Sequence, residues 1–179
     1  MFFSSYKMME DVAECFEEIK TRSTQLLCQN NRMTEQQRDE FLEAFAEDRG
    51  DSLVGFCVMG SIFGEGIDLK RDRLIGAVIV GTGLPQVCNE REILKNYYDK
   101  RNMDGFRYAY LCPGMNKVLQ AAGRVIRTEE DKGIILLLDE RFTKYQYRQM
   151  FPREWADYDT CSLGNVEEKI QNFWFSCSK

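Results

Sequence analysis

The sequence contains no histidine among its 179 residues. This absence excludes Ser-His and Cys-His catalytic arrangements, zinc sites with histidine ligands and an imidazole general base. Its seven cysteines are widely spaced and never form a C-x-x-C pair, which argues against a zinc ribbon or an iron–sulfur cluster in this chain. We interpret most of these cysteines as small buried apolar residues, and free thiols suit a reducing cytosol.

Other absences exclude further kinds of protein and site. No apolar run approaches the roughly 18 residues of a membrane span, and the first residues lack a basic segment followed by a long apolar one. We therefore expect a cytoplasmic protein that does not interact with membranes. The dipeptide Gly-Lys is absent, so the chain has no phosphate loop of the form G-x-x-x-x-G-K-[ST]. The net charge of −5 argues against coating DNA through bulk charge, although it allows a local basic groove.

What is present is an alternation of apolar runs with segments of helical periodicity, in a length that suits one domain over 1–179. This alternation predicts an α/β fold with a mainly parallel sheet, in which ligands gather at the carboxyl ends of the strands. Those ends carry Ser4-Ser5, 60–69, 81–83 and 139–140. Strands are predicted at 1–5, 25–28, 53–59, 74–80 and 134–138, and helices at 6–20, 34–47, 90–100, 113–127 and 164–176.

The segment 113–127 is the most informative stretch. Helical spacing places Gln120, Arg124 and Arg127 at i, i+4 and i+7 on one stripe, with Pro113 as the first helical residue. Guanidinium groups are permanently charged and match phosphate oxygens, so this stripe is a candidate phosphate-binding device. The same pattern also fits a solvated helix face whose arginines pair with surface carboxylates. The residues expected on the buried face are Met115, Val118, Leu119, Ala122, Val125 and Ile126.

A glycine-rich stretch, GSIFGEGIDL at 60–69, follows the third predicted strand. Glycine permits close backbone approach, so N–H groups there can face a phosphate or a ribose. Ser61 could donate to a backbone phosphate, and Asp68 could accept from a sugar hydroxyl. The stretch fits an ordinary strand-to-helix connection equally well.

The last predicted strand ends in Asp139 and Glu140, an arrangement similar to a magnesium-holding pair in P-loop NTPases. That function needs a phosphate loop, which this chain lacks. We therefore predict that these carboxylates have a capping or structural role.

The chain carries, in this order, FFSSY at 2–6, GSIFGEGIDL at 60–69, QAAGRVIR at 120–127 and LLLDERF at 136–142. These four stretches resemble motifs IV, V and VI, and the strand after motif VI, of the DinG/XPD-type superfamily 2 DNA helicases. The likeness runs from residue 2 to about Trp155. It implies a RecA-like, three-layer second (C-terminal) motor domain without its own phosphate loop. In this family the phosphate loop, the magnesium-binding acidic box and any iron–sulfur cluster belong to the first motor domain.

The resemblance also implies residue roles. Arg124 and Arg127 match the arginines that reach the phosphates of ATP held by the first domain, which makes them the candidate catalytic residues. The candidate ATP-binding residues are Gln120, Asp68, Glu65 and Gly66. The candidate nucleic-acid-binding residues are Ser4, Ser5, Tyr6, Gly60, Ser61 and Thr82.

The expected function is therefore that of the C-terminal motor domain of an ATP-dependent DNA helicase. Its expected partners are the first RecA-like motor domain and single-stranded DNA, with ATP and Mg²⁺ bound mainly by that first domain and no metal in this chain. The apolar Phe2-Phe3 at the very start suggests a fragment, and the isolated domain is expected to be inactive. Two other functions remain open, a RecA-like binding or interaction module without turnover and a nucleotide-binding regulator that uses 60–69 alone.

Overall fold

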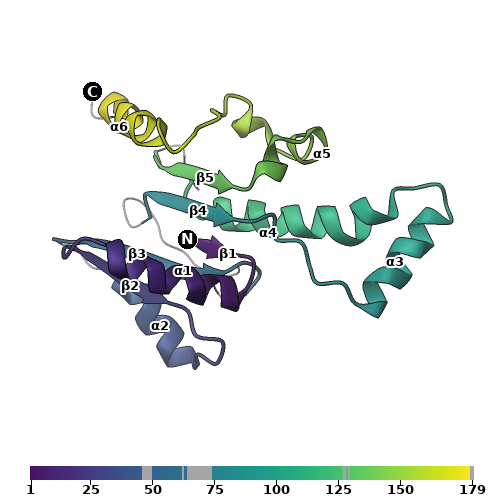
Figure 1. Ribbon diagram of the computed structural model, residues 1–179, viewed down its shortest axis with the longest axis horizontal. Helices are drawn as coiled ribbons and strands as arrows, with labels where there is room; N and C mark the ends of the chain where they lie inside the picture. The colour runs from purple at the N-terminus through teal and green to yellow at the C-terminus, as the bar shows by residue number, and fades with distance from the viewer. Residues whose placement is uncertain (46–49, 62, 64–73, 127, 129, 178–179) are drawn as a thin grey trace.

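Five parallel strands form one sheet in the order β2-β3-β1-β4-β5 (Figure 1). The computed structural model describes residues 1–45, 50–61, 63, 74–126, 128 and 130–177. The predicted α/β class with a parallel sheet is confirmed. The strands are β1 (Phe2–Phe3), β2 (Thr24–Cys28), β3 (Ser52–Val58), β4 (Gly76–Val80) and β5 (Ile134–Leu138).

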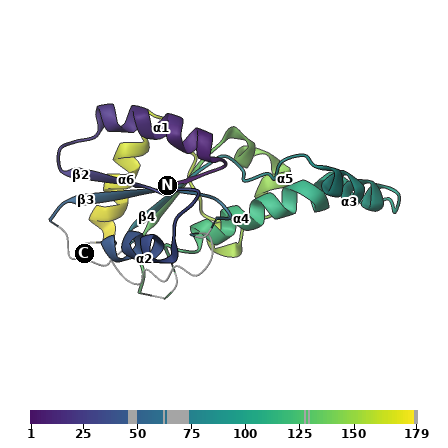
Figure 2. The ribbon, with the colours of Figure 1, turned by 90° about the horizontal axis from the view of Figure 1, so that it is seen from below.

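Helices cover both faces of this sheet, with α1 on one face and α2 and α4 on the other (Figure 2). The α6 helix lies beyond the β5 edge of the sheet (Figure 1). The capping box predicted at Thr34 is present at the start of α2, where Thr34 and Gln37 exchange side-chain and backbone hydrogen bonds. The α-helices are α1 (Tyr6–Ile19), α2 (Glu35–Ala44), α3 (Asn89–Asp99), α4 (Cys112–Ala122), α5 (Tyr145–Arg148) and α6 (Val166–Cys177).

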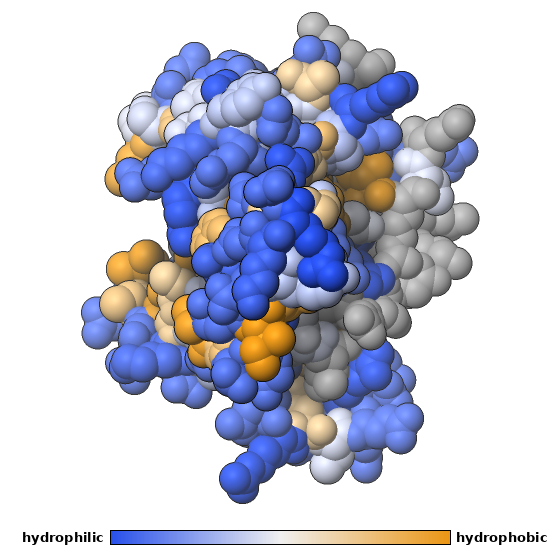
Figure 3. Space-filling model, turned by 90° about the vertical axis from the view of Figure 1, so that its right-hand side faces the viewer, coloured by the Kyte–Doolittle hydropathy of each residue, from blue (hydrophilic) through white to orange (hydrophobic). Residues whose placement is uncertain are grey.

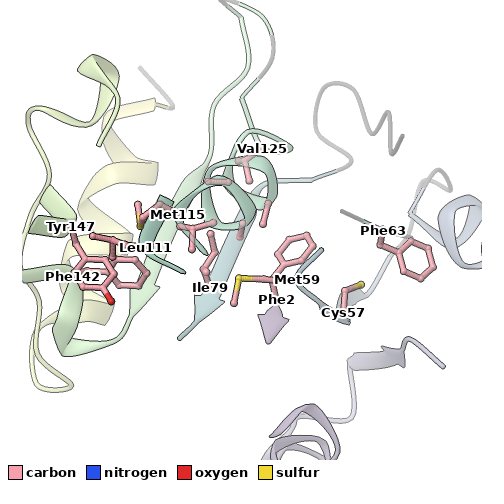
Figure 4. Close-up of a cluster of buried hydrophobic side chains, with 14 of the residues drawn as sticks. Phe2, Cys57, Met59, Phe63, Ile79, Leu111, Met115, Val125, Phe142 and Tyr147 are labelled. Atoms are coloured by element: carbon pink, nitrogen blue, oxygen red, sulfur yellow. The ribbon is translucent and has the colours of Figure 1, made fainter. Parts of the chain in front are cut away.

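The two-residue β1 lies at the centre of the sheet and separates two apolar clusters. Because side chains alternate along a strand, Phe2 and Phe3 point to opposite faces. Phe3 is fully buried in a cluster with Met9 of α1 and Phe56 of β3. Phe2 belongs to the larger cluster, which α4 supplies with several side chains and which Figure 4 shows. A short strand is therefore held by packing on both faces as well as by its hydrogen bonds to β3 and β4.

The α4 helix continues a π-helix, η2, at Arg107–Leu111, and together with α3 this segment extends away from the sheet (Figure 1). Pro113 is the second residue of α4, and helical backbone runs into it from η2, so the prediction that Pro113 is the first helical residue is wrong. Because Pro113 has no N–H, it leaves the carbonyl of Ala109 without its usual α-helical donor. The guanidinium of Arg91 in α3 donates to that carbonyl at 2.7 Å. The bond ties α3 to the helix that it precedes.

Three other predictions from the sequence are wrong in part. The helix predicted at 113–127 ends at Ala122, and a turn follows it. In α6, helical spacing predicts that Val166, Ile170, Phe173 and Trp174 are buried, but they are only half-buried, since α6 packs at the margin of the sheet. Of the seven cysteines, only Cys57 is buried, and its burial raises the pKa of its thiol to about 12.

In the part of the chain that is described, no helix is both long and apolar enough to cross a membrane.

Candidate functional site

The carboxyl ends of β1, β3 and β4 bring three predicted segments to one edge of the sheet, which we call the carboxyl edge. Ser4 follows β1 and is exposed. It lies beside Gly81, where an added Cβ would be 3.5 Å from the Ser4 hydroxyl. Gly60 and Ser61 follow β3, and the Ser61 N–H donates to the Val58 carbonyl at 3.2 Å. The expectation that polar residues gather at this edge is thus met by the arrangement of the strands.

A buried glutamine that the sequence did not reveal connects these strand ends. Gln29 follows β2 and is only 3% exposed. Its Oε1 accepts hydrogen bonds from the Val58 N–H at 2.9 Å and from the Ser61 hydroxyl at 2.8 Å. Its Nε2 donates to the hydroxyl of Tyr6 at 2.8 Å. One amide therefore holds two of the predicted nucleic-acid-binding side chains in place.

Lysine 117 of α4 is a second residue that sequence reasoning missed. Gly60 has a φ of 72°, and an added Cβ there would lie 3.0–3.5 Å from the Cε, Cδ and Cγ atoms of Lys117. The stem of this lysine therefore lies against the Gly60 backbone, an approach that a side chain at position 60 would obstruct. Within the described parts of the chain, Lys117 forms no ion pair. It brings a positive charge to the carboxyl edge.

The remaining predicted nucleic-acid residues differ in how far they are available at the surface. Ser5 caps α1, because its hydroxyl accepts from the Met8 N–H at 3.2 Å. The Ser4 hydroxyl donates weakly to the Met8 sulfur at 3.5 Å and stays exposed. Thr82 is only 1% exposed, and its hydroxyl has no hydrogen-bond partner in the described structure. The fold therefore encloses the Thr82 side chain.

The space-filling view in Figure 3 looks from the side toward which the strand arrowheads point in Figure 1. Most of the coloured surface on this side is hydrophilic, and hydrophobic residues occupy smaller areas between.

The predicted arginine site lies at the opposite, amino edge of the sheet. Arg124 is in the turn after α4, where its N–H donates to the Ala121 carbonyl at 3.3 Å. The next residue, Val125, packs against Gly133 beside Ile75, and these two precede β5 and β4. Gln120 is exposed in the last turn of α4. Gln120 and Arg124 therefore lie apart from the predicted segments at the carboxyl edge.

Arg124 is less exposed than a solvated helix face would make it. The residue is half-buried, and its Nε atom is buried. A guanidinium anchored in this way keeps its planar donor fork in a limited range of orientations. The other predicted nucleotide residues, Arg127, Asp68, Glu65 and Gly66, lie outside the described residues.

Asp139 has the structural role predicted for it. Its carboxylate accepts from the Arg141 N–H at 2.9 Å and pairs with the Arg141 guanidinium at 2.6 and 2.8 Å. The hydrogen bonds from Arg141 hold the pKa of Asp139 below its ordinary value. Among the described residues, no group of three or more His, Cys, Asp or Glu side chains is arranged to hold a metal ion.

Comparison with known proteins decides the family. The family model described as the helicase C-terminal domain matches residues 1–158. The chain belongs to this helicase family, of the DinG/XPD type. A probable ATP-dependent helicase of Methanocaldococcus jannaschii is 25% identical over 181 residues, which cover 94% of this chain and 28% of that protein. The ATP-dependent DNA helicase YoaA of Haemophilus influenzae is 27% identical over 173 residues, which cover 94% of this chain and 25% of that protein.

The fold agrees with this membership. A solved structure of an XPD helicase superimposes with a TM-score of 0.61 and 23% identity, over 83% of this chain and 26% of that one. The likeness confirms the RecA-like α/β architecture predicted from the sequence. This chain spans about a quarter of the length of the two relatives named above.

Proposed function

We propose that this helicase C-terminal domain is the second motor domain of an ATP-dependent DNA helicase. Arg124 would act on ATP and the carboxyl edge would hold single-stranded DNA. The observation that carries the proposal is the position of α4. Lys117 lies at the carboxyl edge from the middle of this helix, Gln120 lies in its last turn, and Arg124 lies in the turn after it, at the amino edge. One helix thus links the two proposed sites.

At the amino edge, Arg124 acts as an arginine finger. ATP and Mg²⁺ are held mainly by the first motor domain of the parent protein, and the Mg²⁺ neutralises phosphate charge there. When the two domains close, the Arg124 guanidinium donates to the phosphates and stabilises the charge that develops during transfer. Gln120 borders the same cleft. Arg127, with Asp68, Glu65 and Gly66 of the glycine-rich stretch, completes the nucleotide contacts in this proposal.

At the carboxyl edge, the chain contacts the phosphates of a single strand. Backbone and hydroxyl groups at Ser4, Ser5, Tyr6 and Gly60 provide neutral contacts, and Lys117 adds one charge. Phosphate contacts position a strand without reading its sequence. A translocating motor domain also has to release the single strand at every step. A net charge of −5 on the chain is compatible with this release.

The test is Arg124→Ala in the full-length parent protein. We expect kcat for ATP hydrolysis to fall at least about a hundredfold, a lower bound set below the effect of known arginine fingers. The 179-residue chain alone should show no ATPase stimulated by single strands, because it lacks a phosphate loop.

The matched control is Arg153→Ala, which removes an exposed arginine from the short helix at Arg153–Trp155. This variant should retain full turnover. Near-normal turnover in Arg124→Ala would show that this arginine does not act on ATP. A parent reading frame without an upstream G-x-x-x-x-G-K-[ST] would contradict the helicase function and favour a module without turnover.

A further inference from the structure

The orientation of the Gln29 amide determines which hydroxyl at the carboxyl edge can donate to a ligand. A backbone N–H is always a donor, so the Gln29 atom 2.9 Å from the Val58 nitrogen has to be the oxygen. The Nε2 group then faces Tyr6, 2.8 Å from its hydroxyl oxygen. Because Gln29 is only 3% exposed, its amide cannot turn over without leaving the buried Val58 N–H unsatisfied.

This orientation uses the only proton of the Ser61 hydroxyl. The Ser61 oxygen lies 2.8 Å from Gln29 Oε1, and two oxygens at this distance need a proton between them. Gln29 Oε1 carries none, so Ser61 has to supply it. The lone pairs of Ser61 are all that remains for a ligand, and they cannot bind a phosphate oxygen. The donor role that the sequence suggested for Ser61 is therefore not compatible with the Gln29 contact.

The Tyr6 hydroxyl, unlike that of Ser61, keeps its proton available for a ligand. Its oxygen accepts from Gln29 Nε2, so its own proton points elsewhere, and no acceptor within the described structure takes it. Burial raises the pKa of Tyr6 above its ordinary value, so the proton is retained at neutral pH. Tyr6 is half-exposed and directly follows the exposed Ser4-Ser5 at the carboxyl edge.

We propose that the Tyr6 hydroxyl is the side-chain donor to a nucleic-acid phosphate at this edge, and that Gln29 is the residue that positions it. This inference rests on the proposed function, because it assumes that a single strand binds at the carboxyl edge. It assigns a role to Gln29, and it separates Tyr6 from Ser61, two hydroxyls that belong to the same edge.

The experiment measures binding of the complete 179-residue chain to fluorescein-labelled oligo(dT) by fluorescence anisotropy. The salt concentration is kept at about 50 mM, where phosphate contacts are strong. We expect Tyr6→Phe to raise Kd roughly tenfold, as the loss of a hydrogen bond to a charged group does. Ser61→Ala should change Kd less than twofold. The salt dependence of Tyr6→Phe should match that of the unmodified chain, because a neutral donor releases no counterion.

The role of Gln29 is tested with Gln29→Glu. A carboxylate at position 29 still accepts from Val58 and Ser61, but it has no proton to give Tyr6, so it turns the Tyr6 proton inward. Adding Tyr6→Phe to this variant should then produce no further loss of binding. The control for a tyrosine hydroxyl is Tyr145→Phe on α5, which is 70% exposed and should bind normally. Circular dichroism checks that each variant is folded.

The outcomes separate this inference from the proposed function. Oligo(dT) binding that is unchanged in Tyr6→Phe, or weakened mainly in Ser61→Ala, overturns the hydroxyl assignment and leaves the motor-domain proposal standing. An additive loss in the double variant overturns the positioning role of Gln29. If the unmodified chain shows no binding, strand contact at the carboxyl edge and this inference fail together.

Discussion

The close contact between α4 and the loop after β4 leads to a prediction that opposes simple helix propensity. Gly114 lies in the first turn of α4 and is buried. A Cβ added there would lie 2.8 Å from the Thr82 carbonyl oxygen and 3.1 Å from the Leu84 nitrogen, both backbone atoms, and 3.0 Å from Leu84 Cδ2. Ordinary contact begins at 3.4 Å. Gly114→Ala would thus push the start of the helix outward by roughly half an ångström, because the interior is close-packed.

Two effects of opposite sign determine how Gly114→Ala changes the free energy of unfolding. Alanine in place of glycine inside a helix stabilises by about 1 kcal/mol. Forcing an extra methyl into a packed site costs about 1–3 kcal/mol, and the upper part of that range applies because backbone atoms on the loop cannot rotate away. The net expectation is a loss of about 1–2 kcal/mol in the free energy of unfolding.

Urea denaturation of the 179-residue chain, followed by circular dichroism, measures this change through the midpoint at constant m. Gly50→Ala is the control, since an added Cβ at Gly50 meets no atom within 4 Å. Its stability should stay within about 0.5 kcal/mol of the unmodified chain. If Gly114→Ala proves more stable by about 1 kcal/mol, propensity alone governs the site, and the close approach of α4 to the loop is refuted.

Two further predictions concern charge. Lys117→Gln should weaken oligo(dT) binding and reduce the slope of log K against log salt by about 0.7, the value for one phosphate contact on a single strand. Lys169→Gln on α6 should leave the slope unchanged, and an unchanged slope in Lys117→Gln would remove this lysine from the interface. Asp139→Asn should cost about 0.5–1 kcal/mol at neutral pH through the lost pairing with Arg141. Because the folded pKa of Asp139 is depressed, that stability is present above the unfolded pKa and is lost as pH falls through the folded value. The two proteins should therefore converge in acid unfolding below about pH 4, and a constant difference at all pH values would assign the effect to packing.

The order of strands and helices was predictable because apolar periodicity and helix capping, the two signals used, are local in the sequence. The apolar runs that became β3 and β5, and the capping box at Thr34, depend on residues that are neighbours in sequence. The end of α4 was misjudged for a related reason. Val125 continues the apolar periodicity of α4, but it is buried against Gly133 after the backbone has turned. An apolar residue in register with a helix need not belong to that helix.

The hydrogen bonds of Gln29 could not be predicted from the sequence. They join residues 23–32 positions apart, and they form only once β2, β3 and β1 are adjacent in the sheet. One signal was available, since Gln29 directly follows a strand, where ligand-binding residues of parallel sheets concentrate. Its burial, which gives the amide one orientation, depends on tertiary packing alone.

The packing of α4 at both ends provides a physical connection between strand contact and nucleotide contact under the proposed function. Gly114 meets the β4 loop at the carboxyl edge, and the turn after α4 packs Val125 against Gly133 at the amino edge. An 11-residue helix is about 16 Å long and does not compress, so a shift at Lys117 also moves the turn that carries Arg124. Catalytic rates can fall a hundredfold for a misplacement of about 1 Å. A displacement of roughly half an ångström at Gly114 is therefore large enough to couple the two edges, and Gly114→Ala in the parent protein should lower the ATPase rate as well as stability.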